Sequence, residues 1–209
     1  QYTGSGAAYD IEIVGEFGYL ADWGRGLVIL NVSDPYNVRE ITHYTLSGAC
    51  VHVSFLNNYI YLTDHYSPYT ALRIIDVSNP SNPILVGSDI HNGIDYWNPV
   101  GYGNKVFICN HGLGGGELRI LDVSQPSNVA LLGVFDERSN IFSSFIDGSR
   151  AYLADYERGL NVVDINNPSN PRKIAQFVDG GHSFDVEVVE NIAFVADGED
   201  GLEIIRILI

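Results

Sequence analysis

One apolar segment occurs five times in this chain of 209 residues, and its spacing constrains the fold more than any other feature. The copies are GLVILNVSDP from Gly26, ALRIIDVSNP from Ala71, ELRILDVSQP from Glu117, GLNVVDINNP from Gly159 and GLEIIRILI from Gly201. Four of the five copies end in a turn that contains proline. Repeats with a period of about 20 to 50 residues are typical of propellers and solenoids, in which each repeat forms one supersecondary unit.

Each copy belongs to a larger unit of four predicted strands. A YLAD-like motif lies just upstream of the apolar segment, another apolar strand precedes that motif, and a fourth strand follows the proline turn. The segments are rich in Val, Ile, Leu, Tyr and Phe, which favour strands, and no stretch shows helical periodicity. Tight turns between the first two strands are expected at Gly15, Asn57-Asn58, Gly103-Asn104, Asp147-Gly148 and Glu190-Asn191. The units recur at nearly regular intervals, and each unit is long enough to form one propeller blade of four strands.

The sequence therefore predicts an all-β fold, a compact five-bladed β-propeller of four-stranded antiparallel blades. It forms a single domain over residues 1–209. The last repeat stops after its third strand, and the first residues, QYTGSGA, match HYTLSGA from His43 at the end of a fourth strand. We therefore expect the N-terminal strand to close the last blade. The expected blades are 7–46, 49–90, 95–136, 140–179 and 182–209 together with 1–4.

The order of these motifs resembles the LVIVD-repeat family of β-propeller proteins. The resemblance rests on YLAD, then GL-x-I-x-DVS-x-P, then a second proline, and it covers almost the whole chain. The chain departs from the pattern at Asn98-Pro99 and in the last repeat, where Arg206 replaces the usual Asp and no proline follows. Members of this family are mostly bacterial or archaeal surface or secreted proteins without an assigned activity. The resemblance implies the fold and an extracellular or cell-surface location, and it supplies no catalytic residues.

The charge balance narrows the class of partner. The chain has 11 Lys and Arg against 26 Asp and Glu, a net charge of −15. Nucleic-acid phosphates and anionic membrane surfaces attract basic side chains, so we expect neither as a partner. No apolar run reaches the length of a membrane span, so we expect no membrane insertion. The excess of acidic residues favours a cation or a basic partner. We expect the chain to be a monomer or part of a larger chain.

The two cysteines, Cys50 and Cys109, occupy strand positions that other repeats fill with Ala or Thr. We expect them to be small buried hydrophobic residues. A disulfide between neighbouring blades remains the alternative, and two cysteines do not identify the redox compartment.

The same sequence interval separates a polar residue of the first strand from the end of the YLAD-like motif in every repeat. It predicts that the two residues lie directly opposite each other, with Cβ atoms about 4.5–5.5 Å apart. The pairs are Asp10 with Asp22, His52 with Asp64, Asn98 with Asn110, Ser143 with Asp155, and Asp185 with Asp197. Two carboxylates at that distance repel unless one is protonated or a cation bridges them. Two interpretations stay open, strand-end caps that bind loop backbone and a Ca²⁺ site formed by Asp10, Asp22, Asp185 and Asp197.

The loop between the second and third strands is longer in the second and third repeats than in the first and fourth. These loops, DHYSPYTA from Asp64 and NHGLGGGE from Asn110, are expected beside HNGIDYWN from His91 on one face of the propeller, the top face. Aromatic residues with polar edges suit a glycan or a peptide. Packing between blades is the alternative role for the aromatics, and a transition-metal site is a second alternative for His65, His91 and His111. The candidate ligand-binding residues are Trp23, His65, Tyr66, Tyr69, His91, Tyr96, Trp97, His111 and Tyr156.

These patterns favour a non-enzymatic binding or scaffolding domain of a secreted or cell-surface protein, which contacts a protein or glycan with its top-face loops. A calcium-associated carbohydrate-binding module is the alternative. A glycoside hydrolase with a carboxylate pair at the central funnel is the third interpretation. The sequence contains neither a Gly-x-Ser-x-Gly elbow nor a Gly-rich phosphate loop followed by Lys and Ser or Thr, so we assign no catalytic residues.

Overall fold

The computed structural model describes residues 2, 4, 6–110, 115–178 and 180–208. These residues form nineteen β-strands in five antiparallel sheets, with one short 3₁₀ helix at Gly198–Asp200. No helix in this part of the chain has the length and apolar character needed to cross a membrane. The predicted all-β fold is confirmed.

Each sheet is a meander of strands that are consecutive in the sequence. Blade 1 contains β1 (Ala8–Val14), β2 (Phe17–Asp22), β3 (Gly26–Asn31) and β4 (Arg39–Tyr44). Blade 2 contains β5 (Ala49–Leu56), β6 (Tyr59–Tyr66), β7 (Tyr69–Asp76) and β8 (Ile84–Asn92). Blade 3 contains β9 (Tyr96–Tyr102), β10 (Lys105–Asn110), β11 (Gly116–Asp122) and β12 (Ala130–Ser139). Blade 4 contains β13 (Ser143–Asp147), β14 (Arg150–Ala154), β15 (Leu160–Asp164) and β16 (Arg172–Phe177). Blade 5 contains β17 (Ser183–Val189), β18 (Ile192–Asp197) and β19 (Gly201–Arg206).

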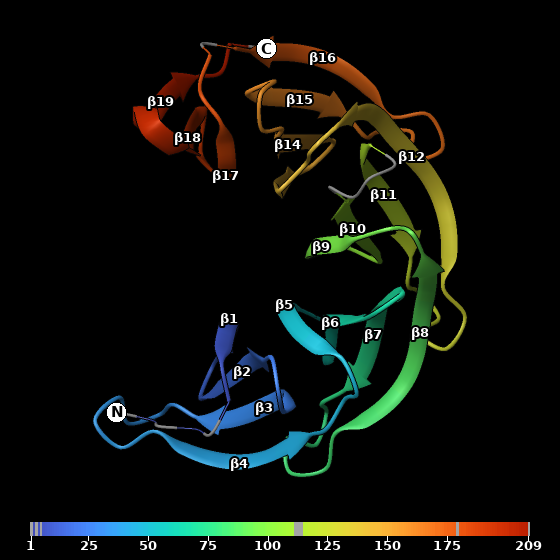
Figure 1. Cartoon of the computed structure of the whole chain (residues 1–209), viewed down its shortest axis with the longest axis vertical. Coiled ribbons are helices and arrows are strands. Elements are labelled where there is room, and N and C mark those ends of the chain that lie inside the picture. The colour runs from blue at the N-terminus through green and yellow to red at the C-terminus, as the bar shows by residue number, and fades with distance from the viewer. Residues whose placement is uncertain (1, 3, 5, 111–114, 179, 209) are drawn as a thin grey trace.

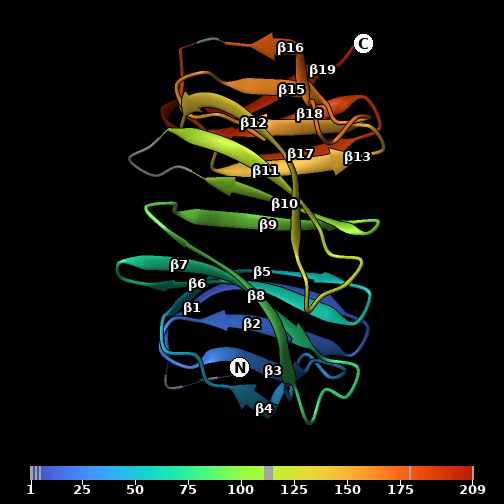
Figure 2. The ribbon, with the colours of Figure 1, turned by 90° about the vertical axis from the view of Figure 1, so that its right-hand side faces the viewer.

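The five blades follow one another around an arc, as expected for a propeller (Figure 1). The first strand of each blade lies on the inside of the arc, and the fourth strands β4, β8, β12 and β16 lie on the outside (Figure 1). In the side view, blades 1 and 2 lie at the bottom and blades 4 and 5 lie together at the top, with β9 and β10 of blade 3 between them (Figure 2). The arc is open between β1 and β17 (Figure 1).

In the described part of the chain the sheet of the last blade contains three strands, and the predicted closing strand is not among them. Tyr2 instead lies against blade 1. Its hydroxyl donates a hydrogen bond to Glu40 and accepts one from Nη1 of Arg25 at 2.9 Å. This arginine–glutamate pair therefore holds Tyr2 at the opposite end of the arc from β19.

The core lies between blades, where facing sheets bury their apolar side chains. Tyr19 and Leu27 of blade 1, for example, pack in one cluster with Cys50 and Leu62 of blade 2. Cys50 and Cys109 are both fully buried and unpaired, so their predicted role as small hydrophobic residues is confirmed. Burial raises the pKa of both thiols, that of Cys109 to about 12.

The first-strand hairpins turn where the sequence predicts them. Gly15, Asn57, Asn58, Gly103 and Gly148 all have positive φ. Glycine and asparagine adopt this left-handed conformation more readily than other residues, which explains their recurrence at these turns. Glu190 also has positive φ, at +56°, in a hairpin whose turn contains neither glycine nor an Asn pair.

The predicted direct pairing of aspartates is wrong. Asp22 pairs with Ala8, and Asp10 pairs with Ala21, because β1 contains an irregularity between Ala8 and Asp10. Blade 5 repeats this register, with Asp197 opposite Ser183 and Asp185 opposite Ala196. A β-bulge inserts one residue into a strand and shifts the pairing beyond it. Because the irregularity recurs, the sequence interval stays constant although the two residues are not partners.

Candidate functional site

The aspartates of the YLAD-like motifs are buried strand-end residues. Asp22, Asp64, Asp155 and Asp197 are each at most 2% exposed. Oδ1 of Asp22 accepts a hydrogen bond from the backbone nitrogen of Gly24 at 3.1 Å, as a loop cap does. A Cβ atom added at Gly48 would overlap the Asp64 carboxylate, and Gly6 and Gly181 have the same relation to Asp22 and Asp197. These carboxylates therefore fit against the glycine that precedes each first strand.

Asp10 and Asp185 connect neighbouring blades along the inside of the arc. Oδ2 of Asp10 accepts a hydrogen bond from the backbone nitrogen of Val53 at 3.0 Å, and His52 lies beside it. Burial would raise the pKa of Asp10, but the hydrogen bonds from His52 and Val53 lower it overall. Oδ1 of Asp185 accepts a hydrogen bond from the Ser143 hydroxyl at 2.6 Å. Both side chains thus stabilise contacts between innermost strands.

The predicted cation site is not formed in the described residues. They contain no group of three or more His, Cys, Asp or Glu side chains placed to hold a metal ion. The physical reason is the register, which separates Asp10 from Asp22 and Asp185 from Asp197, together with the open arc between blades 1 and 5. His65 and His91 also have different partners, Asp95 and Asp89. His111 lies outside the described residues.

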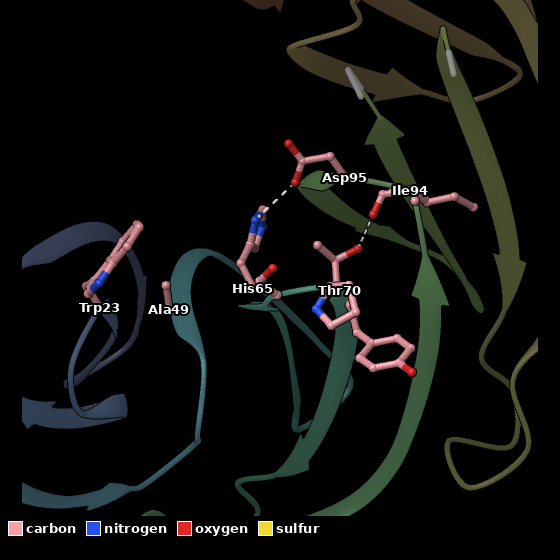
Figure 3. Close-up of a pocket in the computed structure, with 10 residues that line it drawn as sticks. Trp23, Ala49, His65, Thr70, Ile94 and Asp95 are labelled. Atoms are coloured by element: carbon pink, nitrogen blue, oxygen red, sulfur yellow. Dashed lines mark hydrogen bonds and ion pairs between the residues drawn. The ribbon is translucent and has the colours of Figure 1, made fainter. Parts of the chain in front are cut away.

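A cavity of about 450 Å³ opens on the top face. It lies between the β2–β3 loop of blade 1, the β6–β7 hairpin of blade 2 and the link that leads into blade 3 (Figure 3). Its size is typical of pockets for small ligands or peptide side chains. The wall is apolar apart from a few polar groups, and its principal residues are Trp23, His65, Tyr69, Thr70, Ile94 and Asp95.

Trp23 forms one wall of this top-face pocket (Figure 3). It follows β2 directly, and its backbone nitrogen donates a hydrogen bond to the carbonyl of Ala7 at 2.9 Å. Its indole stacks on Tyr9 with ring centroids 5.2 Å apart and remains 49% exposed. The stacking fixes the ring while leaving half of its surface accessible to a ligand.

His65 and Asp95 form the opposite wall (Figure 3). Nδ1 of His65 lies 3.0 Å from Oδ1 of Asp95, and Nε2 lies 2.8 Å from the backbone oxygen of Tyr96. Either neutral tautomer donates one of these hydrogen bonds, and the doubly protonated ring donates both. The ring of Trp97 meets His65 edge-on at 5.8 Å. His65 therefore joins the end of β6 to the start of β9.

Two further lining residues, Thr70 and Ile94, form a second link between blade 2 and the segment before blade 3. The Thr70 hydroxyl donates a hydrogen bond to the backbone oxygen of Ile94 (Figure 3). Tyr69, which is 43% exposed, packs against Tyr66 with ring centroids 5.7 Å apart. Arg73 lies over the Tyr66 ring and pairs with buried Asp64 at 2.8 Å. The pocket is thus supported by a buried ion pair.

Some of the predicted binding residues meet at this pocket and others do not. Trp23, His65 and Tyr69 line it, and Trp97 and Tyr66 pack directly behind them. Tyr96 is fully buried between blades, where its hydroxyl donates a hydrogen bond to Asp89 at 2.7 Å. Tyr96 therefore does not lie among the accessible top-face residues with which the sequence grouped it. Burial, followed by the Asp89 contact, raises its pKa. His91 contacts the same carboxylate at 3.2 Å.

Tyr156 belongs to a separate aromatic group at blades 4 and 5. Its ring stacks on His182 with centroids 4.4 Å apart and also packs against Phe142 and Phe184. The structure therefore assigns Tyr156 a packing role between blades that the sequence left as an alternative.

Sequence reasoning did not single out Asp95, Thr70 or Ile94. Asp95 and Ile94 occur in the loop HNGIDYWN, in which the candidate residues were His91, Tyr96 and Trp97. The available signal was an acidic side chain next to two aromatic residues in a loop between blades. Thr70 gave no signal, because threonine is common in strands.

Antiparallel blades around an arc, with a pocket at their strand ends, define a repeat protein of the β-propeller class. The LVIVD repeat model matches residues 5–45, 47–89, 102–137, 145–178 and 180–207. These matches cover most of the chain, which therefore belongs to the LVIVD-repeat family. The resemblance stated from the motifs is confirmed.

A solved structure with the same fold comes from a functionally unknown protein of Desulfotomaculum acetoxidans DSM 771. It aligns with a TM-score of 0.78 and 15% identity, over 99% of this chain and 70% of that chain. At this identity the likeness establishes the fold alone. A search of curated protein sequences found no match.

Proposed function

We propose that this domain binds a protein or peptide ligand, without chemical turnover, through the top-face pocket. The ligand side chain that enters the pocket is long and basic, lysine or arginine. The observation that carries this proposal is the position of the Asp95 carboxylate, 35% exposed, at the edge of a pocket walled by Trp23, Tyr69 and Ile94.

The chemistry of the walls matches such a side chain. Lysine and arginine bury their methylene stems on apolar surface while the charged group remains near polar partners. Here Trp23 and Tyr69 offer the apolar surface, and an aromatic face also attracts a cation directly. Asp95 supplies the opposite charge in the pocket wall. The net charge of −15 favours the approach of a basic partner from a distance.

Carbohydrate binding is the second candidate. The exposed faces of Trp23 and Tyr69, 49% and 43% exposed, are suited to stacking against a sugar ring. Such a ligand would depend on the aromatic wall and would not need the Asp95 charge. We also propose the extracellular or cell-surface location that the family resemblance implies, which labelling of intact source cells with an antibody to this domain tests.

The test uses the immobilised domain, a random peptide library displayed on phage and a glycan array. We expect selected peptides to be rich in lysine or arginine next to apolar residues. Their affinity should fall about tenfold or more in Trp23→Ala and in Asp95→Asn. The matched control is Tyr36→Ala, whose ring is 93% exposed in the β3–β4 turn, at the opposite end of β3 from Trp23.

The possible outcomes separate the candidates. Glycan binding that is lost in Trp23→Ala and kept in Asp95→Asn would support the carbohydrate candidate. Binding of either ligand that Trp23→Ala leaves unchanged would contradict a functional role of this pocket. Turnover of a bound ligand would contradict the non-enzymatic assignment.

A further inference from the structure

Blade 5 exposes a surface that every other blade buries. Each blade presents four corresponding side chains to the blade that follows it, two from its second strand and two from its third. In blade 1 these are Tyr19, Ala21, Leu27 and Ile29, and they are at most 3% exposed. The corresponding residues of blades 2 to 4 are also at most 3% exposed. They are Tyr61, Thr63, Leu72 and Ile74 in blade 2, Phe107, Cys109, Leu118 and Ile120 in blade 3, and Tyr152, Ala154, Leu160 and Val162 in blade 4.

In blade 5 the same four positions are Phe194, Ala196, Leu202 and Ile204. Leu202 and Ile204 are each 64% exposed. Their side chains have the size and apolar character of the residues that pack between blades elsewhere. The sequence of blade 5 is thus built for an interface that the described structure does not contain.

Blade 1 exposes the complementary surface at the other end of the arc. Ile11 is 43% exposed, whereas the corresponding Val53 and Val186 are 5% and 4% exposed against their preceding blades. Ile13 is 60% exposed, whereas the corresponding Val188 is 6% exposed. The two open ends therefore offer the two halves of one recurring interface.

The edge of blade 5 gives a second, independent indication. The third strands β3, β7, β11 and β15 each pair with an outer strand, whereas β19 pairs only with β18 in the described part of the chain. A cavity of about 200 Å³ lies beside it, lined by Leu160, Val162, Ala175, Phe177, Ile205 and Ile207. The space between blades 1 and 2 that corresponds to this cavity is filled by an outer strand. There, Leu85 of the outer strand β8 packs in the cluster that contains Tyr44. Tyr44 of blade 1 corresponds to Phe177 of blade 4. An outer strand paired to β19 would fill the corresponding cavity.

We propose that the two ends of the arc are blade-to-blade interfaces whose partner is further blades of the same repeat fold, about two, in the same polypeptide. The five blades of this chain match 70% of the solved protein of the same fold. The remainder of that protein has room for about two blades of the size seen here. Such blades supply an outer strand for β19, cover Leu202 and Ile204, and present a face to Ile11 and Ile13.

A second copy of the chain is the competing occupant. The end of one copy and the start of the next would form a head-to-tail contact, which builds open chains unless its rotation closes a ring. The likeness to a longer solved fold favours further blades over this arrangement.

The test compares the natural polypeptide at its full length with the 209-residue chain, each carrying Leu202→Lys. In the full-length protein we expect Tm to fall by about 5 °C or more, because the substitution places a charge in a buried interface. In the 209-residue chain we expect no fall, because Leu202 is exposed there. The matched control is Ile84→Lys in β8, a residue that is 53% exposed, and it should leave Tm unchanged in both proteins.

Hydrogen exchange of β19 provides a readout that does not depend on a variant. We expect the β19 amides to exchange more slowly in the full-length protein than in the 209-residue chain, because an added strand pairs with their open edge. Equal exchange, or an equal Tm for Leu202→Lys and wild type in the full-length protein, would overturn the proposal. A dimer of the 209-residue chain that Leu202→Lys converts to monomer would also overturn it, in favour of a second copy.

Discussion

Nδ1 of His65 lies 3.0 Å from Oδ1 of Asp95, and this contact joins blade 2 to the link that enters blade 3. The pocket therefore takes its polar wall from two blades and its aromatic wall, Trp23, from a third. A site assembled in this way depends on how the blades pack, because no single blade holds all of its residues. This dependence explains why the supporting contacts, such as Thr70 with Ile94, also cross between blades.

Replacing Asp95 with asparagine should weaken the binding of basic peptides about tenfold while changing the free energy of unfolding by less than about 1 kcal/mol. The charge is partly exposed, so its pairing with His65 contributes little to stability. Calorimetric titration and urea denaturation measure the two effects. The control is Asp136→Asn in β12, which removes the same charge from a residue that is 53% exposed away from the pocket. Equal loss of affinity in both variants would mean that net charge alone attracts the ligand.

Replacing Arg73 with methionine should lower the free energy of unfolding by about 3 kcal/mol, because it leaves the buried Asp64 carboxylate without its partner. The Asp64 side chain is 0% exposed, and its Oδ2 lies 2.8 Å from Nε of Arg73. The matched control is Arg25→Met, whose pair with Glu40 is partly exposed and should contribute under about 1 kcal/mol. Urea denaturation compares the two, and similar losses would contradict a structural role for the buried pair.

Replacing Gly48 with alanine should destabilise the fold by about 2 kcal/mol or more, since its Cβ would overlap the Asp64 carboxylate and the backbone of His65. Gly24→Ala is the control, because nothing lies within 4 Å of a Cβ atom there. A thermal melt of both variants checks the prediction. A Tm for Gly48→Ala that matches that of Gly24→Ala would show that the Asp64 cap is not tightly packed.

Glu40 should contribute to the dependence of stability on pH. The hydrogen bond from Arg25 holds its pKa at about 2, below its usual 4.5. Its contribution is therefore present above about pH 4.5 and is lost as the pH falls through 2. Solvent screening limits it to about 1 kcal/mol or less. Urea denaturation between pH 7 and pH 2 should show wild type and Glu40→Gln converging at the acid end, and a constant difference would contradict the pairing.

The fold was predictable from the sequence because each repeat contains the local signals for its own strands and turns. The glycine and asparagine turns and the apolar strands recur from unit to unit, and each unit forms the strands that its residues favour. The constant interval between Asp10 and Asp22, and between their counterparts, misled the register prediction because a bulge near Asp10 repeats along with the motif. A constant count cannot reveal an irregularity that recurs with the repeat.

The pocket was only partly predictable for a different reason. Trp23, His65 and Tyr69 were identified as loop aromatics and histidines, and they do meet on the top face. Tyr96 was placed beside them, yet it is the first residue of β9 and its side chain is buried between blades. Which side chains converge is decided by packing between blades, and a single repeat does not contain that information.

The central claim is that a ligand enters the pocket against Trp23. The most direct measurement is the fluorescence of Trp23 during a titration with a selected basic peptide. The chain has two tryptophans, so the titration uses the Trp97→Phe variant, in which Trp23 is the remaining tryptophan. We expect a blue shift that follows the occupancy measured by calorimetry, because the bound side chain removes water from the exposed indole. Complete binding by calorimetry with unchanged Trp23 emission would contradict the claim.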